Sequence, residues 1–119
     1  MSNILIADSH GRRRVQIEVF AQRNGHHTYS VGTIAEAMRY AEIYVPDILI
    51  APDSLPDGDT DELISAFRAS NRAMLRELAI ITCRKPGAMD RNVIVSRNNS
   101  AAALVGEAEN VLSRSATAA

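Results

Sequence analysis

Short apolar runs alternate along this chain with segments in which apolar residues recur at helical spacing. The first run, Asn3–Asp8, is apolar up to its final acid and predicts a strand. Apolar residues then recur at helical spacing, at Val15, Val19 and Phe20. Gly25 follows this stretch at a position where helices commonly end, so the pattern predicts a helix before it.

The same alternation continues through the middle of the chain. His27–Val31 predicts a second, weaker strand. Thr33 and Glu36 have the spacing of a capping box, and the helix that they begin ends before Pro46. The run Asp47–Ala51 is almost entirely aliphatic, as expected for a strand buried on both faces of a parallel sheet. We therefore expect this third strand to be central.

The second half of the chain repeats the pattern. A loop rich in proline, glycine and aspartate precedes a third helix, which Asp59 and Glu62 are expected to cap. Leu78–Cys83 predicts a fourth strand, and Val93–Val95 predicts a short fifth strand. Ser100 is expected to cap a last helix, whose apolar residues lie on one stripe.

Strands that alternate with helices predict an α/β fold, with an open, five-stranded, mainly parallel sheet and helices on both faces. One spacing departs from this plan. Ten residues separate Thr82 from Val93, whereas a parallel crossover needs roughly a dozen with a helix among them. We therefore expect the fourth helix to be shortened or missing. The 119 residues suit one domain, expected over residues 1–112, followed by a flexible tail over residues 113–119.

Charge and composition exclude several classes of protein. Thirteen basic and fourteen acidic residues give a formal charge of -1, so no overall field favours nucleic acid or an anionic membrane. The apolar runs are far shorter than the ~20 residues that cross a bilayer, and the start of the chain lacks the pattern of an export signal. The single cysteine, Cys83, cannot form an internal disulfide. We expect a cytoplasmic protein that binds neither nucleic acid nor membrane.

Three segments share the order and spacing of a known family. They are Ile4–His10, Pro46–Asp57 and Ile80–Cys83, and they run to the ends of predicted strands, where open parallel sheets bind ligands. In these segments the chain resembles the receiver domains of bacterial two-component response regulators, over almost its whole length from Asn3 to about Leu112. The resemblance implies a flavodoxin-like fold, phosphorylation of an aspartate after the third strand, and Mg²⁺ held by a pair of acids after the first strand.

Position by position, the chain departs from this family at the residues that carry the chemistry. Asp8 matches the first acid of the metal-binding pair, but the second acid falls on Ser9. The phosphoacceptor falls on Pro52, which has no nucleophile. Mg²⁺ is usually held by one or two carboxylates together with phosphate and water, so Asp8 alone makes a poor site. The resemblance therefore implies a degenerate receiver, or pseudo-receiver, that uses no cofactor and is not an enzyme.

Two further positions of the family's pocket have polar counterparts. The switch hydroxyl is matched by Thr82, and the lysine after the fifth strand falls on Ser96 or, with a shift of one residue, on Arg97. The alternative to a pseudo-receiver is thus a domain phosphorylated on Asp53 with Mg²⁺, in which Thr82 and Arg97 contact the phosphate. Strict strand alternation would turn Asp53 to the opposite face of the sheet, unless this residue already lies in the loop.

Other candidate groups have simpler interpretations. Three acids alternate as at the start of a calcium loop: Asp57, Asp59 and Asp61. The glycine that should follow the third acid is replaced by Glu62, so we interpret the three as caps of the third helix. The run Arg12–Arg14 is interpreted as a solvated helix face, with an anion or an acidic partner as the alternative.

The histidines and the cysteine give little support to a metal site or a catalytic site. His10, His26 and His27 lie on two predicted loops, without ligands at metal-binding spacing. His10, beside the degenerate pocket, is a candidate for titration near neutral pH. Cys83 is interpreted as a small buried hydrophobe, with a reactive thiol as the alternative. A glycine-rich phosphate loop and the residue order of a catalytic triad are both absent from the sequence.

These observations predict a stand-alone signalling adaptor that binds other proteins constitutively. With the fourth helix missing, apolar side chains of the fourth and fifth strands are expected to lose their cover and to form a patch for a partner. The first expected partner is a second copy, bound through these strands and the last helix. The expected rim residues are Arg84, Lys85, Met89, Arg91, Arg97 and Leu104.

Overall fold

The computed structural model describes residues 2–118, with side chains through residue 114, and contains one parallel five-stranded sheet in the order β2-β1-β3-β4-β5. The strands are β1 (Asn3–Ala7), β2 (His27–Val31), β3 (Ile48–Ile50), β4 (Ile80–Thr82) and β5 (Val93–Val95). The helices are α1 (Gly11–Arg23), α2 (Ile34–Ile43), α3 (Thr60–Arg68), α4 (Ala73–Arg76) and α5 (Ala101–Ala118). The predicted α/β fold is confirmed.

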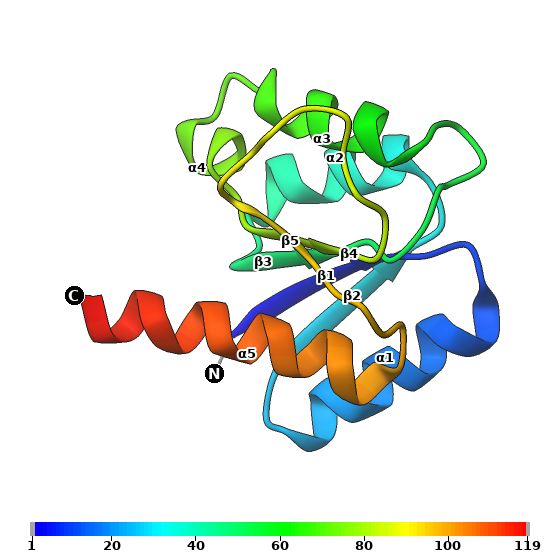
Figure 1. Cartoon of the computed structure of the whole chain (residues 1–119), viewed down its shortest axis with the longest axis vertical. Helices are drawn as coiled ribbons and strands as arrows, with labels where there is room; N and C mark the ends of the chain where they lie inside the picture. Colours follow the sequence, from blue (N-terminus) through cyan, green and yellow to red (C-terminus); the bar gives the residue numbers. More distant parts are fainter. Residues whose placement is uncertain (1, 119) are drawn as a thin grey trace.

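Helices cover both faces of the sheet. Helices α1 and α5 lie on one face, and α2, α3 and α4 lie on the other (Figure 1). The alternation of side chains along β1 divides the core accordingly. Leu5 packs with residues of α2 and α3, whereas Ile4 and Ile6 pack with residues of α1 and α5. The third strand is central and wholly buried, as its aliphatic run predicts.

The predicted helix caps form at three helices. The Asp59 carboxylate accepts from the Glu62 backbone N–H and the Glu62 carboxylate accepts from the Asp59 backbone N–H, which completes the capping box of α3. At α2, the Thr33 hydroxyl accepts from the Glu36 backbone N–H. At α5, the Ser100 hydroxyl accepts from Ala103. Each cap satisfies a backbone donor that the first helical turn leaves free.

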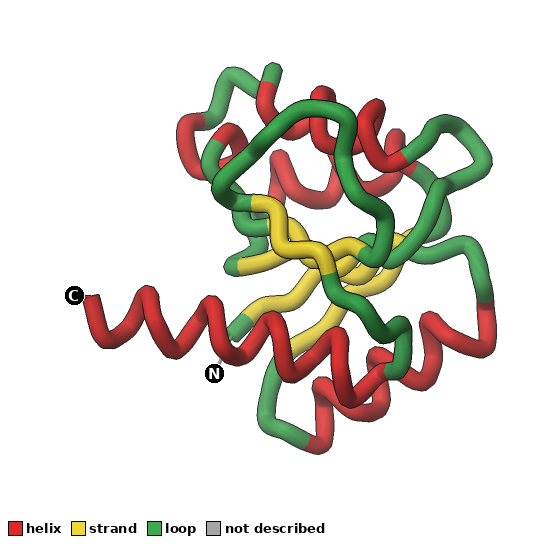
Figure 2. The backbone as a smooth tube through the Cα atoms, in the orientation of Figure 1, coloured by secondary structure: helices red, strands yellow, loops and turns green. Residues whose placement is uncertain are grey.

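The connection between β4 and β5 contains no helix. Residues 83–92, all of which the structure describes, form a loop that arches beside α3 (Figure 2). The short helix α4 instead precedes β4 and is a second helix in the crossover from β3. The expectation from the spacing between Thr82 and Val93 is therefore confirmed, whereas α4 is a feature that the sequence pattern did not predict.

The last helix reaches into the segment for which we expect a flexible tail, since α5 spans Ala101–Ala118. The flexibility of residues 113–119 stays a prediction. Ala119 lies outside the described residues. Among the helices in residues 2–118, none combines the length and the apolar character that crossing a bilayer requires.

Candidate functional site

Asp8, the acid that the sequence predicts at the degenerate pocket, forms an ion pair with a cation of the same chain. Its side chain is only 1% exposed at the end of β1. Arg13 donates through Nε to one carboxylate oxygen at 2.6 Å and through Nη2 to the other at 2.8 Å. The His10 backbone N–H also donates to Oδ1, at 2.9 Å. Both oxygens of this buried carboxylate are thus occupied by protein donors.

The start of α1 brings Arg13 to this position. His10 is the N-cap of α1, and its Nδ1 accepts from the Arg13 backbone N–H at 3.3 Å. The first helical turn therefore lies directly beside the end of β1. The hydrogen bond to Asp8 raises the pKa of the Arg13 guanidinium above its ordinary value. A cation in the first turn of a helix is disfavoured by the helix dipole, and the bidentate pair with Asp8 offsets that cost.

The other positions of the family's metal site do not supply the missing ligands. Ser9 is exposed to solvent, and Pro52 is buried after β3. The Pro52 carbonyl accepts from the Cys83 backbone N–H at 3.1 Å, which joins the ends of β3 and β4. Mg²⁺ requires oxygen ligands in near-octahedral geometry. With Asp8 held by Arg13 and no carboxylate at residues 9 and 52, the residues present do not fit a Mg²⁺ site.

Asp53, the alternative acceptor, is paired as well. Strand β3 ends at Ile50, so Asp53 lies in the loop and not within the strand alternation. Its Oδ1 accepts from the Ser54 backbone N–H at 2.7 Å and from Arg84 Nε at 2.6 Å. These two hydrogen bonds, that of Ser54 first, lower the pKa of the Asp53 carboxyl below its ordinary value. The Asp53 side chain remains 41% exposed and lies beyond the carboxyl ends of the strands, as Asp8 does.

The two hydroxyl residues of the pocket are used to hold loops. Thr82 is fully buried, and its Oγ1 accepts from the Arg84 backbone N–H at 3.2 Å. Ser96 is buried, and its hydroxyl donates to the Asn98 carbonyl at 2.7 Å. Arg97 is exposed at the surface. These residues therefore lie at the carboxyl ends of the strands. The hydroxyls of Thr82 and Ser96, however, form hydrogen bonds with the backbone of the loops that follow.

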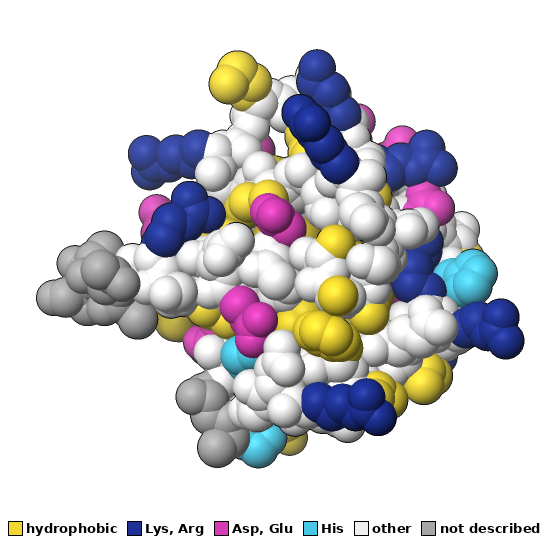
Figure 3. Space-filling view, turned by 60° about the horizontal axis from the view of Figure 1, so that its bottom comes forward, with side chains coloured by type: hydrophobic (Ala, Val, Ile, Leu, Met, Phe, Trp, Pro, Cys, Tyr) yellow, Lys and Arg dark blue, Asp and Glu magenta, His cyan; other side chains and the backbone are white. Residues whose placement is uncertain are grey.

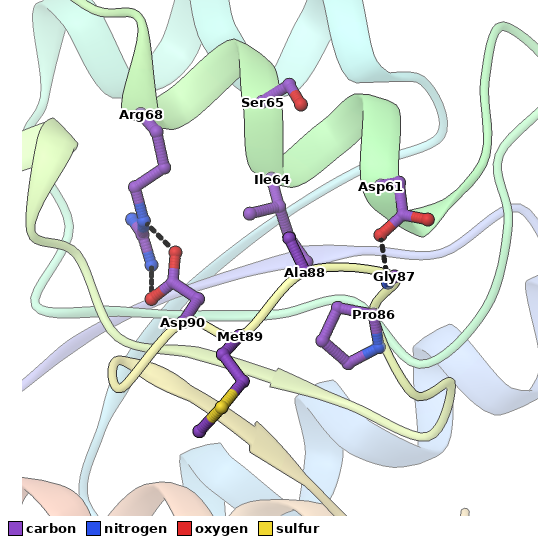
Figure 4. A pocket seen from close by; sticks show the side chains of 9 residues that line it. All are labelled: Asp61, Ile64, Ser65, Arg68, Pro86, Gly87, Ala88, Met89 and Asp90. Atoms are coloured by element: carbon purple, nitrogen blue, oxygen red, sulfur yellow. Dashed lines mark hydrogen bonds and ion pairs between the residues drawn. The ribbon is translucent and has the colours of Figure 1, made fainter.

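The loop over residues 83–92 is held against α3 at two points (Figure 4). Asp61 accepts from the Gly87 backbone N–H at 2.8 Å. Arg68 donates to Asp90 through Nε at 2.6 Å and through Nη2 at 3.1 Å, and this pairing lowers the pKa of the Asp90 carboxyl. A pocket of about 390 Å³ remains between the loop and the helix. The loop that connects β4 to β5 in place of a helix is thus fixed by charged and backbone hydrogen bonds.

The residues expected at the rim of a partner surface differ in their exposure. Five of its residues are exposed, and they are Arg84, Lys85, Met89, Arg91 and Arg97. Leu104 is wholly buried between α5 and the sheet, so its assignment to the rim was wrong. The apolar cover of β4 is also kept, because Ile80 and Ile81 are fully buried. In β5 only Val95 is exposed, at 43%.

The three alternating acids accept hydrogen bonds at three different places. Asp57 accepts from the backbone N–H groups of Ile34 and Ala35, at 2.8 and 3.0 Å, and so caps α2. These bonds, that of Ile34 first, lower the pKa of the Asp57 carboxyl. Asp59 caps α3, and Asp61 holds the loop of residues 83–92. The interpretation of all three as caps of α3 was therefore correct only for Asp59. Across the described part of the chain, no three histidine, cysteine or acidic side chains gather in a way that could hold a metal ion.

The histidines and the cysteine take structural positions. His10 caps α1. His26 Nε2 lies 2.9 Å from Oε2 of Glu109, and this contact joins the turn after α1 to α5. His27 is exposed at the start of β2. Cys83 is partly buried, and burial raises the pKa of its thiol. A raised pKa disfavours the reactive thiolate, in agreement with the interpretation of Cys83 as a packing residue.

An apolar surface lies away from the carboxyl ends of the strands, on the face formed by α1 and α5 (Figure 3). A groove of about 360 Å³ is lined by Val15, Val19, Phe20 and Ala101, among others. The helical spacing of Val15 and Val19 correctly predicts α1. Their side chains point outward, however, and are 54% and 39% exposed. The core of α1 is formed instead by Ile17 and Ala21.

Arg13 is the residue that sequence reasoning missed. The run Arg12–Arg14 predicts a solvated helix face, yet Arg13 is the cation that neutralises Asp8. The signal is present in the spacing, because Arg13 stands five residues after Asp8 and within the first turn of the helix that follows it. A buried acid at a strand end needs a cationic partner, and the first helical turn is the nearest segment that can supply one.

Comparison with solved structures identifies the fold. A protein from Chloroflexus aurantiacus J-10-fl that is named a response regulator matches with a TM-score of 0.77 and 20% identity, over 94% of this chain and 98% of that one. The chemotaxis response regulator CheY4 of Vibrio cholerae matches with a TM-score of 0.75 and 16% identity, over 93% and 98%. The response regulator TrrA of Thermotoga maritima, solved with Mg²⁺-BeF, matches with a TM-score of 0.63 and 18% identity, over 80% and 86%.

The chain therefore has the CheY-like, flavodoxin-type fold of response regulator receiver domains. No protein-family model matches the sequence, and neither does any curated protein. The resemblance inferred from three short segments is thus supported at the level of fold.

Proposed function

We propose that this chain is a receiver-type signalling domain that acts through protein contacts and without phosphorylation. The observation that carries the proposal is the bidentate pair of Arg13 with Asp8, at 2.6 and 2.8 Å, next to a proline at the acceptor position. A receiver that accepts a phosphoryl group needs a carboxylate nucleophile and a metal to neutralise the phosphate. In this chain the guanidinium of Arg13 already neutralises the carboxylate of Asp8.

A contrast with one structural neighbour supports this proposal. TrrA was solved with Mg²⁺-BeF bound. In this chain, Arg13 supplies a positive charge beside Asp8 that needs neither metal nor phosphate. We infer that Mg²⁺ and phosphate cause no change of conformation at this end of the sheet. On this account the chain is not an enzyme, it uses no cofactor, and its partners are proteins of a signalling pathway in the cytoplasm.

The loop of residues 83–92 is the contact surface that we assign to a signalling partner. Its two attachments to α3 hold exposed Met89 in place between them. Lys85 and Arg91 flank it and are exposed. An exposed apolar side chain on a fixed loop, with cations on both sides, suits a partner surface that has an apolar pocket with an acidic rim. Arg91→Glu is expected to weaken this contact while changing the free energy of unfolding by less than about 0.5 kcal/mol.

One observation favours a second function, phosphorylation on Asp53. This carboxylate is 41% exposed and lies in the loop after β3, so a phosphodonor can reach it. Hydrogen bonds from the Ser54 backbone N–H and from Arg84 lower the pKa of this carboxyl, so it is ionised, as a nucleophile must be.

Treatment with acetyl phosphate and Mg²⁺, followed by intact mass measurement, separates the two functions. The proposal predicts no stoichiometric gain of a phosphoryl group in the wild-type chain. A gain that requires Mg²⁺ and disappears in Asp53→Asn would establish the second function and refute the first. Ser54→Ala, which keeps the acid, is the matched control.

A further inference from the structure

All three tyrosines of the chain lie together at one edge of the sheet. The rings of Tyr29 on β2 and Tyr40 on α2 are stacked, with centroids 4.1 Å apart. Tyr44 lies next to Tyr40, with centroids 5.2 Å apart. Tyr29, Ile43 and Tyr44 are 51%, 65% and 63% exposed. An aromatic and aliphatic surface of this kind is typical of a protein contact.

The strand beside this cluster has one free edge. Strand β2 is the outermost strand and is hydrogen-bonded to β1 alone (Figure 1). The His27 N–H donates to the Ser2 carbonyl at 2.8 Å, and the Val31 carbonyl accepts from Asp8 at 3.0 Å. In a parallel ladder, alternate residues bond to the same neighbour. The backbone groups of Thr28 and Ser30 therefore point away from the sheet.

This edge lacks the features that protect exposed strands. Natural edge strands are shielded by charged residues, proline, bulges or short length. His27–Val31 has five residues and contains no lysine, arginine, aspartate, glutamate or proline. The opposite edge strand, β5, has only three residues and is flanked by Arg91 and Arg97. The sheet is thus protected at one edge and open at the other.

We propose that a second copy of this chain binds at β2, with the two strands antiparallel about a two-fold axis through Tyr29. In this register Thr28 of each copy lies opposite Ser30 of the other. Because both residues point outward, each such pair exchanges two backbone hydrogen bonds. Tyr29 then lies opposite its own counterpart in a non-hydrogen-bonded pair, where Cα atoms are about 4.5 Å apart and cross-strand aromatic pairs are favourable.

The charges around the tyrosines also favour a second copy as the partner. Beside the tyrosines, α2 carries the exposed acid Glu36 and, three residues later, the exposed base Arg39. A two-fold rotation reverses the order of these two charges, so the arginine of one copy can face the acid of the other. A partner of a single charge sign would meet repulsion at one of these positions. This contact requires neither metal nor phosphate, so it is independent of the proposed function.

Sedimentation equilibrium over a concentration series tests the proposal. The wild-type chain is expected to form a dimer. Ser30→Pro removes one outward N–H from each copy and leaves the ladder to β1 intact, so it should raise the dissociation constant about tenfold or more. Tyr29→Lys places a charge on the two-fold axis and should act in the same direction. Val95→Lys, which makes the corresponding change at the exposed residue of the other edge strand, is the matched control and should leave the dimer unchanged.

Amide hydrogen exchange provides a readout that misfolding of a variant cannot imitate. In the wild-type chain the amides of Thr28 and Ser30 should gain protection as the concentration rises, while the amides of His27 and Tyr29 are protected at all concentrations by β1. A monomer at every concentration would overturn the proposal. A dimer that Val95→Lys dissociates would also overturn it. So would a dimer in which the amides of Thr28 and Ser30 stay unprotected, because another surface, or a strand of a different protein, would then provide the contact.

Discussion

The guanidinium of Arg13 and the carboxylate of Asp8 are joined by two hydrogen bonds, 2.6 and 2.8 Å long, at the end of the first strand. The acid is almost completely buried, whereas the arginine is 16% exposed. The cation therefore closes over the acid from the solvent side. This pair neutralises the buried carboxylate at the end of β1 with a cation of the same chain.

Loss of Arg13 should be costly because it leaves a buried charge without a partner. We expect Arg13→Ala to lower the free energy of unfolding by about 3 kcal/mol, as is typical when one member of a buried ion pair is removed. Arg12→Ala, at an exposed neighbour, should change it by less than about 0.5 kcal/mol. Urea unfolding of both variants gives the comparison. A cost below about 1 kcal/mol for Arg13→Ala would show that water reaches Asp8 and replaces the pair.

The cap that Asp57 provides for α2 predicts an effect far from its position in the chain. Asp57→Ala removes the acceptor for two backbone N–H groups of the first turn of α2 and should cost about 1 kcal/mol. Glu42→Ala, an exposed change near the end of the same helix, is the control. Amide exchange in residues 34 and 35 should rise in Asp57→Ala alone. Unchanged exchange at these two amides would contradict the assignment of this cap.

A methyl group at Gly58 would force neighbouring side chains to move. A Cβ at residue 58 would lie 2.7 Å from Cδ1 of Ile34, 3.0 Å from Oε2 of Glu62 and 3.2 Å from Cβ of Glu62. We expect Gly58→Ala to cost about 1 kcal/mol, because the ends of both side chains must shift and the capping carboxylate of Glu62 is one of them. At Gly11, in the first turn of α1, no atom lies within 4 Å of the added carbon. Gly11→Ala should therefore be neutral or stabilising in the same thermal or urea unfolding assay.

The pair of Arg68 with Asp90 predicts a pH dependence. The pKa of Asp90 is lowered from its ordinary value of 3.8, first by the hydrogen bond from Arg68. Since the folded pKa lies below the unfolded one, the pair contributes stability above the unfolded pKa and loses it as the pH falls through the folded pKa. Asp90→Asn and Arg68→Met should both make the fall in stability below about pH 4 shallower. An unchanged slope in both variants would show that the ion pair does not persist in solution.

The fold could be predicted because its main determinants are local. The aliphatic run of β3, the capping box of Asp59 and Glu62, and the short spacing before Val93 each constrain the chain within a few residues. The order of these elements then restricts the topology, since parallel crossovers have one preferred hand.

The site could be predicted only in part, because its contacts join residues that pattern alone cannot pair. Ile34 is 23 residues from Asp57, and nothing in the sequence shows that these two meet. The run of three arginines does not reveal which one turns inward. Leu104 was assigned to a surface although its stripe correctly predicts a helix, because the expected bare face of the sheet was covered after all. Such errors concern side-chain direction and long-range packing, which depend on the whole fold.

A Mg²⁺ titration followed by NMR tests the central claim most directly, because the Arg13 Nε–H and the backbone amides of Asp8 and Ser9 report on the pocket itself. Since the carboxylate is held by Arg13, the account predicts no saturable shift of these signals up to about 20 mM Mg²⁺, well above the range in which a working carboxylate site would be filled. A saturable shift centred on Asp8, with loss of the Arg13 Nε–H hydrogen bond and no response in Asp8→Asn, would contradict it.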